Sequence, residues 1–362
     1  MRNLALVGYG YWGPKIARAA AGLPEWRLAA ICDYSPERLA AAGRAHPDAE
    51  CLPDVSALWS RPEIDAVVIA TPTQTHYALA QAALLAGKHA LVEKPLVQSH
   101  GEALALFDLA RATGRILRTG HTYLHDPAVL RVREILRLGW LGELRYIHSA
   151  RRNLGLVRRD TNVIWDLGPH DASILTAWLD SPPTRVAASG WGWLSGNQAE
   201  VAHLRFAYAE NLVATVDLSW VAPEKERRIT LVGTKGMLVW DDLRTPRLTL
   251  HAKRVEVDPR TGAVAVADDG GTAVALPQVE PLRAQLERFG RAIDQAGASG
   301  SDPSGLDLTV VQMLVAAQAS LEQGGEPVAV GESPSTLWTA PADGLDRPDT
   351  KLTRRGRAHS WR

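Results

Sequence analysis

The chain has 362 residues, more than one hydrophobic core commonly supports, so we expect two domains. Hydrophobic residues make up 46% and charged residues 22%, the balance of an ordinary globular protein. Forty basic residues offset forty acidic ones, and this zero net charge disfavours a nucleic-acid binder, which needs a basic excess against phosphates.

Cysteine usage and hydropathy exclude further classes. The two cysteines, Cys32 and Cys51, are too few for a disulfide framework or a thiolate zinc site. No stretch has the form of a signal peptide, and no apolar run is as long as a membrane span. We therefore expect a cytoplasmic protein that binds neither nucleic acid nor membranes.

The first third of the chain alternates apolar strands with helices. Helices are predicted over residues 14–22, 35–46, 76–87 and 99–114. They follow strands that are continuous apolar runs, at residues 3–8, 27–33, 65–71, 88–95 and 115–121. This pattern is typical of a doubly wound parallel α/β sheet with helices on both faces, and it predicts a dinucleotide-binding Rossmann domain over residues 1–122.

A glycine motif falls at the first junction of strand and helix. Gly8, Gly10 and Gly13 form G-x-G-x-x-G within LVGYGYWGPK. The first glycine permits a tight turn, the second lets a pyrophosphate approach the backbone, and the third lets the helix pack closely on the strand. Asp33 ends the second predicted strand, where a carboxylate accepts hydrogen bonds from the adenosine ribose. Together these features predict a dinucleotide site.

The same segment bears on the choice of cofactor. The carboxylate of Asp33 repels a 2′-phosphate and favours NAD, while the nearby Arg38 keeps NADP open as the less favoured alternative. Tyr11 and Trp12 fill the free positions between Gly10 and Gly13. We expect them to lie over the pyrophosphate or toward the substrate; the alternative is a packing role alone.

The pattern changes after residue 122. A helix over 127–138, an alternating strand over 141–151 and a turn that becomes a helix over 164–179 precede a strand-rich region from 184 to 277. Two closing helices are predicted over 281–296 and 306–322. These elements predict an α+β domain over residues 123–330, built on a large, mostly antiparallel sheet that also binds the substrate. The uncovered sheet face of such a domain can pair with a second copy, so we expect a homodimer or homotetramer.

The last segment, residues 331–362, shows no periodicity and contains three prolines between 333 and 362. A loose tail is the simpler interpretation, because chain ends are poorly ordered unless something holds them. Docking of Trp338 and Trp361 on a neighbouring molecule is the alternative.

Two groups of residues carry candidate chemistry. Glu93, Lys94 and Pro95 follow a buried strand of the parallel sheet, at the edge where ligands bind. The stretch WDLGPHD places Asp166 and His170 four residues apart, on one face of a helix. The alternatives are a surface lysine at a strand end and a pair of helix-capping residues.

This order of motifs resembles the Gfo/Idh/MocA family of nicotinamide-dependent sugar and cyclitol oxidoreductases. The resemblance rests on EKP after a dinucleotide fold, on D-x-G-x-H at residues 166–170 and on the large sheet that follows, and it covers residues 1–330. It implies that Lys94 and His170 are catalytic and that Asp166 supports them. It also implies cofactor contacts from a set that spans three strand ends: Thr71, Pro72, Thr73, His76, Glu93, Lys94 and His121.

The chain departs from the family pattern at one position. The family motif usually carries a second Asp three residues after the His, and here Ser173 stands at that position. Asp171 immediately follows the His instead, which leaves its role open.

The chemistry of these residues suits oxidation of a secondary alcohol. His170 can take the hydroxyl proton, since an ordinary imidazole titrates near neutral pH. Lys94 can hydrogen-bond the same oxygen as it becomes an alkoxide. Asp166 can fix the imidazole or grip a neighbouring hydroxyl. The reaction requires no metal, and the sequence lacks the ligand cluster of a catalytic zinc.

The segment RRNLGLVRRDTNVIWD before the catalytic motif is rich in arginine. Its arginines can grip a diphosphate or a carboxylate, or they can belong to a solvated loop or a subunit contact: Arg151, Arg152, Arg158 and Arg159. Its other polar residues offer hydrogen bonds to sugar hydroxyls: Asn153, Asp160 and Asn162. Tyr123 and Trp165 can pack on a sugar face or belong to the core.

Three hypotheses of function follow. The arginine-rich segment resembles family members that act on UDP-N-acetylhexosamines, so the leading hypothesis is an NAD-dependent dehydrogenase or reductase that acts on the 3-hydroxyl of a nucleotide sugar. The second is a dehydrogenase of free cyclitols or monosaccharides. The third, from another class, is a catalytically silent dinucleotide-sensing regulator, since a fold does not fix a function. The presence of both Lys94 and His170 disfavours the third hypothesis.

Overall fold

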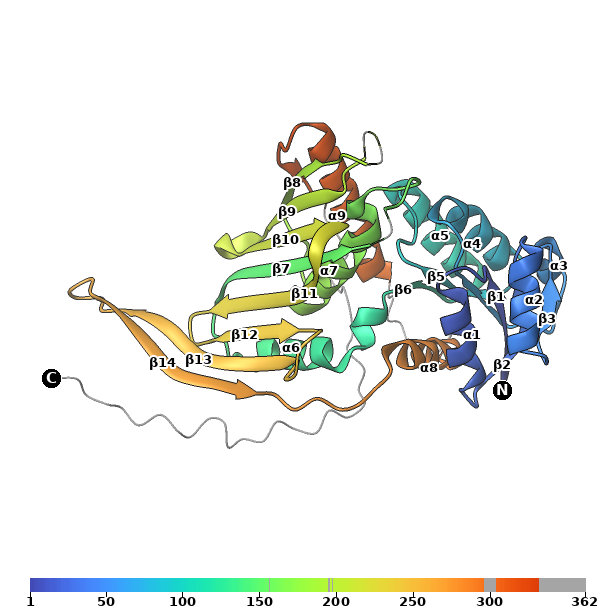
Figure 1. Ribbon diagram of the computed structural model, residues 1–362, viewed down its shortest axis with the longest axis horizontal. Coiled ribbons are helices and arrows are strands. Elements are labelled where there is room, and N and C mark those ends of the chain that lie inside the picture. Colours follow the sequence, from blue (N-terminus) through green and yellow to red (C-terminus); the bar gives the residue numbers. More distant parts are fainter. Residues whose placement is uncertain (156, 195, 197, 296–303, 332–362) are drawn as a thin grey trace.

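The N-terminal domain, about the first third of the chain, is built on a parallel sheet (Figure 1). The computed structural model describes residues 1–155, 157–194, 196, 198–295 and 304–331. Six strands lie in the order β3-β2-β1-β4-β5-β6, and every neighbouring pair is parallel. They are β1 (Arg2–Val7), β2 (Trp26–Cys32), β3 (Glu50–Leu52), β4 (Ala66–Ile69), β5 (His89–Glu93) and β6 (Leu117–Gly120). The predicted doubly wound fold is confirmed.

The helices of this domain begin at the signals that the sequence offers. Ser35 caps α2 by accepting a hydrogen bond from the amide of Arg38, and Ser99 caps α5. The helices are α1 (Gly13–Ala21), α2 (Pro36–Ala45), α3 (Ser56–Trp59), α4 (His76–Leu85) and α5 (His100–Thr113), with a 3₁₀ turn at Thr73–Thr75. Strand β3 and helix α3 were not predicted, because elements of three and four residues are too short for a periodic pattern.

The second domain is built on a nine-stranded sheet in the order β14-β13-β12-β11-β7-β10-β9-β8-β15. Only β7 and β10 pair in parallel; the other neighbours are antiparallel, as predicted. The strands are β7 (Leu144–Leu154), β8 (Arg185–Trp191), β9 (Val201–Ala207), β10 (Val213–Ser219), β11 (Val221–Gly233), β12 (Met237–Asp241), β13 (Leu248–Val257), β14 (Val264–Ala273) and β15 (Val328–Ala329).

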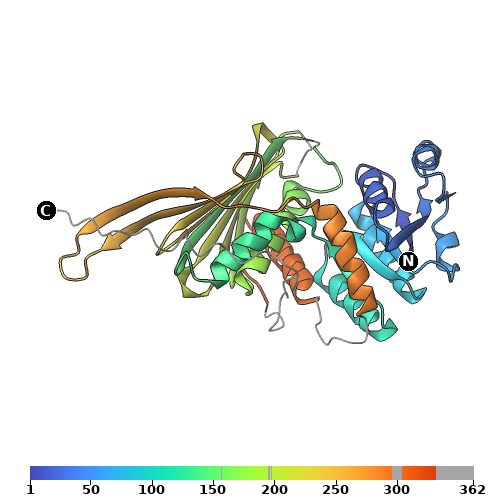
Figure 2. The same cartoon turned by 90° about the horizontal axis from the view of Figure 1, so that it is seen from below.

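Helices cover one face of this sheet and leave the other open (Figure 2). The covering helices are α6 (Pro127–Arg137), α7 (Val163–Leu179) and α9 (Ser304–Glu322), with 3₁₀ turns at Thr122–His125 and Ala209–Asn211. The open face exposes Tyr146 and Trp191, and the β13–β14 hairpin extends away from the body of the molecule (Figure 1). Assembly through this face stays a prediction.

The last two helices join the two domains. Helix α8 (Pro281–Asp294) returns to the N-terminal domain, where Phe289 stacks on Trp26 at 5.8 Å between ring centroids and the carbonyl of Leu286 accepts from the Trp26 indole. Helix α9 contributes Leu308 to the core of the parallel-sheet domain and Val310 to that of the second domain. Residues assigned by sequence to 123–330 thus also complete the core of the first domain.

Two further predictions concern the C-terminal tail and membrane-spanning helices. The tail at 331–362, with Trp338 and Trp361, lies outside the described residues apart from Gly331. Among the helices that the structure does describe, none combines the length and apolar character that a bilayer crossing needs.

Candidate active site

A cleft of about 860 Å³ runs along the carboxyl ends of the parallel strands and reaches helix α7. This is the edge at which doubly wound sheets bind ligands. Its walls include Gly8 after β1, Asp33 after β2, Thr71 after β4 and Lys94 after β5. Ten more of the predicted site residues also line this cleft: Gly10, Tyr11, Trp12, Pro72, Thr73, Glu93, Arg158, Asp160, Trp165 and Asp166.

The glycine loop leaves room for phosphates and not for side chains. Gly8 has a φ of +97°, and a Cβ there would lie 2.6 Å from the carbonyl oxygen of Ala70. A Cβ on Gly13 would lie 2.5 Å from the oxygen of Gly8, so helix and loop touch through backbone. At Gly10 the nearest atom to an added Cβ is Arg38 Nη1 at 3.8 Å, an ordinary van der Waals contact, so the backbone there is uncrowded. The loop and the start of α1 therefore fit a dinucleotide pyrophosphate.

The carboxylate of Asp33 is fixed beside this loop. Its Oδ2 accepts a hydrogen bond from the amide of Tyr9 at 2.7 Å, and its Oδ1 accepts one from the amide of Ser35 at 2.9 Å. Arg38 Nη1 lies 3.6 Å from Oδ2, and the Arg38 side chain is about half exposed. The side chain is thus held where it can accept from ribose hydroxyls, with an arginine at the edge of the same site.

The two aromatic residues of the loop are held by a lysine. Lys15 Nζ lies 3.6 Å from the ring centroid of Tyr11 and 4.4 Å from that of Trp12, and the two rings meet edge to face. Both rings line the cleft, and Tyr11 is 73% exposed. The role of these rings over cofactor or substrate stays a prediction.

Asp166 positions Lys94. Lys94 Nζ donates to the Asp166 carbonyl at 2.6 Å and lies 3.3 Å from Oδ1, and both side chains are largely buried. Arg158 Nε lies 3.1 Å from the same Oδ1, and Trp220 Nε1 donates to Oδ2 at 3.0 Å. Within the described chain no side-chain hydrogen bond joins Asp166 to His170. The idea that Asp166 fixes the imidazole is therefore wrong, because its oxygens already serve a lysine, an arginine and an indole.

His170 packs against Tyr123 as a neutral imidazole. The rings meet edge to face at 5.1 Å between centroids. Burial lowers the pKa of His170 well below its ordinary value, and the positive charges of Lys94, Arg151 and Arg227 lower it further. A neutral imidazole at pH 7 is ready to accept a proton.

Glu93 is buried under the cleft next to Lys94. Burial raises the pKa of its carboxyl group to about 7, against the opposing effect of the Lys94 charge. The Glu93 side chain leaves little room at Gly120, where a Cβ would lie 3.1 Å from Oε1. This carboxyl group is thus poised between its protonated and ionised forms at neutral pH.

His76 and His121 are not among the described residues that line the cleft, and their cofactor contacts stay a prediction. The ring of His76 is hydrogen-bonded to the carbonyls of Pro95 at 2.9 Å and Thr71 at 3.0 Å, so it ties together the two loops that form the cleft wall. His121 Nε2 lies 3.1 Å from Asp307 Oδ1 of helix α9. Both histidines are committed to neighbouring loops and helices.

Two of the four arginines that could grip an anion are paired with carboxylates of the protein itself. Arg151 Nε donates to Asp171 Oδ2 at 2.7 Å, and both side chains are buried, which also answers the question of what Asp171 does. Arg152 points to the open sheet face, where it pairs with Asp217 at 3.5 Å and Glu226 at 3.4 Å. Arg158 alone of the four lines the described cleft.

The remaining polar residues of this segment divide between capping and loop positions. Asn162 accepts from the amides of Ile164 and Trp165, so α7 is helical from Val163 and the predicted turn is wrong. Asn162 is thus the N-cap of α7, and its contact with substrate stays a prediction. Neither Asn153 nor Arg159 is among the described residues that line the cleft.

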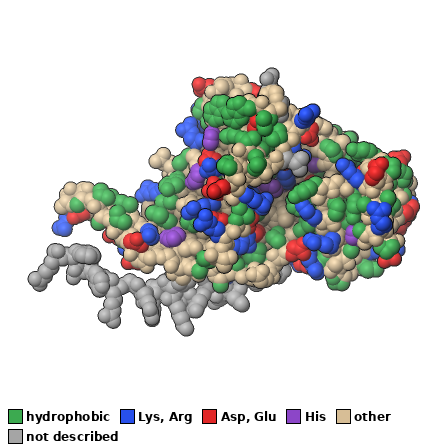
Figure 3. All heavy atoms as spheres, viewed as in Figure 1, with side chains coloured by type: hydrophobic (Ala, Val, Ile, Leu, Met, Phe, Trp, Pro, Cys, Tyr) green, Lys and Arg blue, Asp and Glu red, His purple; other side chains and the backbone are tan. Residues whose placement is uncertain are grey.

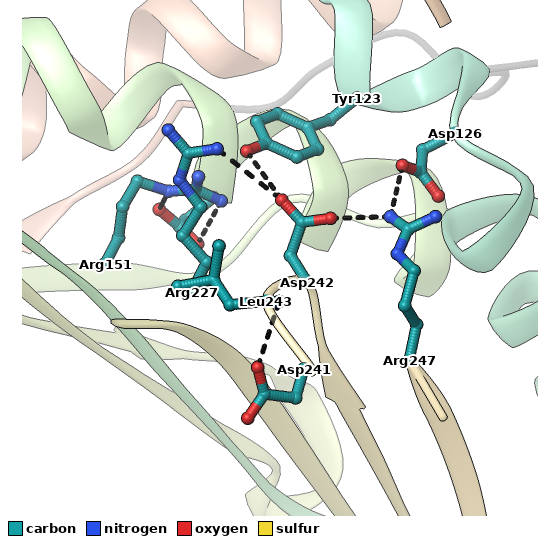
Figure 4. Close-up of polar contacts among 9 residues, drawn as sticks. Tyr123, Asp126, Arg151, Arg227, Asp241, Asp242, Leu243 and Arg247 are labelled. Carbon is teal, nitrogen blue, oxygen red and sulfur yellow. Dashed lines mark hydrogen bonds and ion pairs between the residues drawn. The ribbon is translucent and has the colours of Figure 1, made fainter. Parts of the chain in front are cut away.

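Sequence reasoning missed Trp220, Arg227 and Asp242. Trp220 holds Asp166, and the other two lie in a polar network with Tyr123 (Figure 4). None of them follows a motif, so no local signal could have identified them.

Comparison with known proteins places this geometry in a family. Residues 2–121 match the oxidoreductase family with an NAD-binding Rossmann fold, and residues 129–239 match the GFO/IDH/MocA C-terminal domain. The chain belongs to the Gfo/Idh/MocA family. It is an oxidoreductase with an NAD-binding Rossmann domain, as the motifs predicted, and this disfavours the silent regulator.

Similar proteins act on sugars and cyclitols. The UDP-N-acetylglucosamine 3-dehydrogenase of Acidithiobacillus ferrooxidans is 32% identical over 80% of this chain and 87% of its own. A solved structure of that enzyme covers 89% of this chain and 98% of its own, with 28% identity and a TM-score of 0.74. An inositol 2-dehydrogenase of Acidothermus cellulolyticus is 32% identical over 51% of this chain and 56% of its own.

Proposed function

We propose that this oxidoreductase moves hydride between NAD and a secondary alcohol or ketone of a sugar, with Lys94 and His170 as the catalytic residues. The observation that carries the proposal is that helix α7 brings two groups within one turn of each other: Asp166, which holds Lys94 in the cleft wall, and His170, a neutral imidazole on which the Lys94 charge acts.

The residues divide the reaction between them. Bound NAD supplies the hydride acceptor for oxidation. The ammonium of Lys94, oriented by both oxygens that Asp166 offers it, donates to the substrate oxygen and stabilises its developing negative charge. His170 accepts the hydroxyl proton, and in the reverse direction it returns that proton to the alkoxide oxygen.

NAD is proposed over NADP. A 2′-phosphate would lie against Asp33, whose oxygens are held by the amides of Tyr9 and Ser35 and cannot turn away. Arg38 offsets part of this repulsion, so we expect NADPH to bind more weakly than NADH but still to bind. Titration of intrinsic fluorescence with NADH and NADPH tests it, and equal affinity for the two would contradict it.

The proposed substrate is a UDP-N-acetylhexosamine, oxidised at the sugar 3-hydroxyl. The similar dehydrogenase of A. ferrooxidans supports it, as does the guanidinium of Arg158 in the cleft wall. A free cyclitol or monosaccharide is the second candidate. It is favoured by the finding that Arg151 and Arg152 are committed to carboxylates, which leaves fewer cations for a diphosphate.

Steady-state rates with UDP-N-acetylglucosamine, myo-inositol and glucose separate the candidates. The nucleotide-sugar proposal expects the highest kcat/KM with the first compound, and turnover of the free polyols alone would overturn it. Lys94→Met and His170→Gln variants test the site, and full activity in either would remove that residue from the proposed mechanism.

A further inference from the structure

Two arginines face each other on the inner side of the nine-stranded sheet. Arg151 on β7 and Arg227 on β11 are register partners across an antiparallel pair. Like charges at facing positions destabilise a sheet unless counter-charges offset them. Asp171 offsets Arg151, and Asp242 lies beside Arg227 (Figure 4).

The two arginines are neutralised unequally. Arg151 makes two hydrogen bonds to Asp171 and is buried. The Arg227 side chain has a single described contact, from Nη1 to Asp242 Oδ2 at 3.5 Å, and it is 38% exposed. Asp242 is bound more closely by Arg247, at 2.6 Å. Most of the N–H donors of Arg227 are thus unused within the described structure.

Arg227 also belongs to the surroundings of the catalytic imidazole. The Asp242 oxygen that it approaches accepts from the hydroxyl of Tyr123 at 3.4 Å, and the ring of Tyr123 packs edge to face against His170. The positive charges of Lys94, Arg151 and Arg227 all act on His170. Figure 3 shows basic side chains around the hollow between the sheet and the Rossmann domain.

We infer that Arg227 binds an anionic group, a carboxylate or a phosphate, carried on the sugar ring that reacts at His170. A guanidinium fork with free donors matches either group, and Asp242 holds the fork in place without saturating it. The inference rests on the proposed function, and it names the substrate as an acidic sugar or a glycosyl phosphate. In both compounds the charged group is attached to the same sugar ring that contains the reacting carbon.

The test compares charged with neutral sugars in three variants. Arg227→Gln removes the charge, Arg227→Lys keeps it without the fork, and Arg228→Gln is the matched control at the next residue, which is exposed. The probes are N-acetylglucosamine, glucuronic acid, N-acetylglucosamine 1-phosphate and UDP-N-acetylglucosamine. With Arg227→Gln we expect the KM of the charged sugars to rise about 10- to 100-fold while that of the neutral sugar changes less than about twofold.

The remaining results decide between the sources of charge. A larger effect with glucuronic acid assigns a carboxylate, and a larger effect with the two phosphates assigns a glycosyl phosphate. Arg227→Lys should keep part of the preference, and Arg228→Gln should keep all of it. An equal rise for charged and neutral sugars, or no rise for any, overturns the inference.

Calorimetric binding separates this inference from the proposed reaction. If the charged sugars bind to the wild-type chain and bind about tenfold more weakly to Arg227→Gln, the anion site stands even where no sugar is turned over. If a neutral sugar is turned over and Arg227→Gln changes nothing, the reaction stands and the anion site is overturned. Thermal melting of each variant shows that it is folded.

Discussion

The dinucleotide cleft and the site around His170 on the inner face of the nine-stranded sheet (Tyr123, Arg151, His170 and Arg227), here called the sheet site, differ in what fixes their geometry. In the cleft the main chain sets the shape, because Gly8 and Gly13 touch neighbouring carbonyls and backbone amides hold Asp33. Around His170 side chains set the shape, because Arg151 and Asp171 form a buried ion pair with each other within the core. A site fixed by backbone tolerates little change of shape, whereas a site fixed by side chains tolerates little change of charge.

The same contrast explains how each site handles its ligand. The cleft offers amides and an uncrowded backbone at Gly10, features that suit any dinucleotide. The sheet site offers a neutral His170 and partly neutralised arginines beside Lys94 of the cleft wall, features that select a particular substrate. Cofactor binding and substrate choice should therefore respond to different substitutions.

Replacement of His170 tests whether catalysis can be lost while cofactor binding is kept. His170→Gln should lower kcat by about 10²- to 10⁴-fold, because the variant has no group to accept the proton. The affinity for NADH, measured by fluorescence, should not change, since His170 is not among the described residues of the cleft wall. A loss of NADH affinity as large as the loss of kcat would show that His170 also supports the dinucleotide cleft, and it would contradict the separation of the two sites.

Removal of Asp171 tests the dependence on charge. Asp171→Asn leaves the buried guanidinium of Arg151 without its counter-charge and should lower the free energy of unfolding by about 3–5 kcal/mol. Urea denaturation measures it. The control is Asp108→Asn in an exposed pair with Arg111, where the loss should stay below about 1 kcal/mol. Similar losses in the two variants would contradict the comparison.

Two glycine variants test the dependence on backbone shape. Gly13→Ala forces a methyl group against the Gly8 carbonyl and should destabilise the fold by about 1–3 kcal/mol, as overpacking does. Gly10→Ala meets only an ordinary van der Waals contact with Arg38, so it should fold normally yet weaken NADH binding, because the methyl group occupies the approach to the phosphates. Normal NADH affinity in Gly10→Ala would place the pyrophosphate elsewhere.

Asp33→Asn tests cofactor choice with a smaller expected effect. The amide side chain no longer repels a 2′-phosphate and accepts more weakly from ribose, so NADH affinity should fall about tenfold while NADPH affinity rises. Fluorescence titration of both cofactors measures the ratio. An unchanged ratio would assign cofactor choice to Arg38, for which Arg38→Gln is the matched variant.

The smallest expected effect is on the pH dependence. The pKa of His170 lies well below 6.5, so its imidazole stays unprotonated and kcat/KM for oxidation should not fall as the pH drops from 7 toward 6. Initial rates across this range measure it. A fall centred near 7 that disappears in Glu93→Gln would assign the titration to Glu93, whose pKa is about 7. A fall centred near 6.5 that survives in Glu93→Gln would contradict the lowered pKa of His170.

The sequence by itself determined the features that depend on neighbours along the chain. The glycine spacing of residues 8–13, the caps at Ser35 and Ser99, and the candidate pair Asp166 and His170 on one helical face could all be predicted. Turns, caps and helical faces form between residues a few positions apart, so the pattern of residue types is enough to reveal them.

Only the tertiary structure decided which charges meet. It paired Arg151 with Asp171, placed the Lys94 ammonium against Asp166 and left Arg227 with unused side-chain donors next to Asp242, which also accepts from Tyr123. It also turned His76 and His121 into ties between loops and helices. These contacts depend on the register of β7 against β11 and on the packing of α7 over the sheet. A shift of one residue in that register would move every side chain of the strand to the other face, which is why residue spacing along the chain could not predict them.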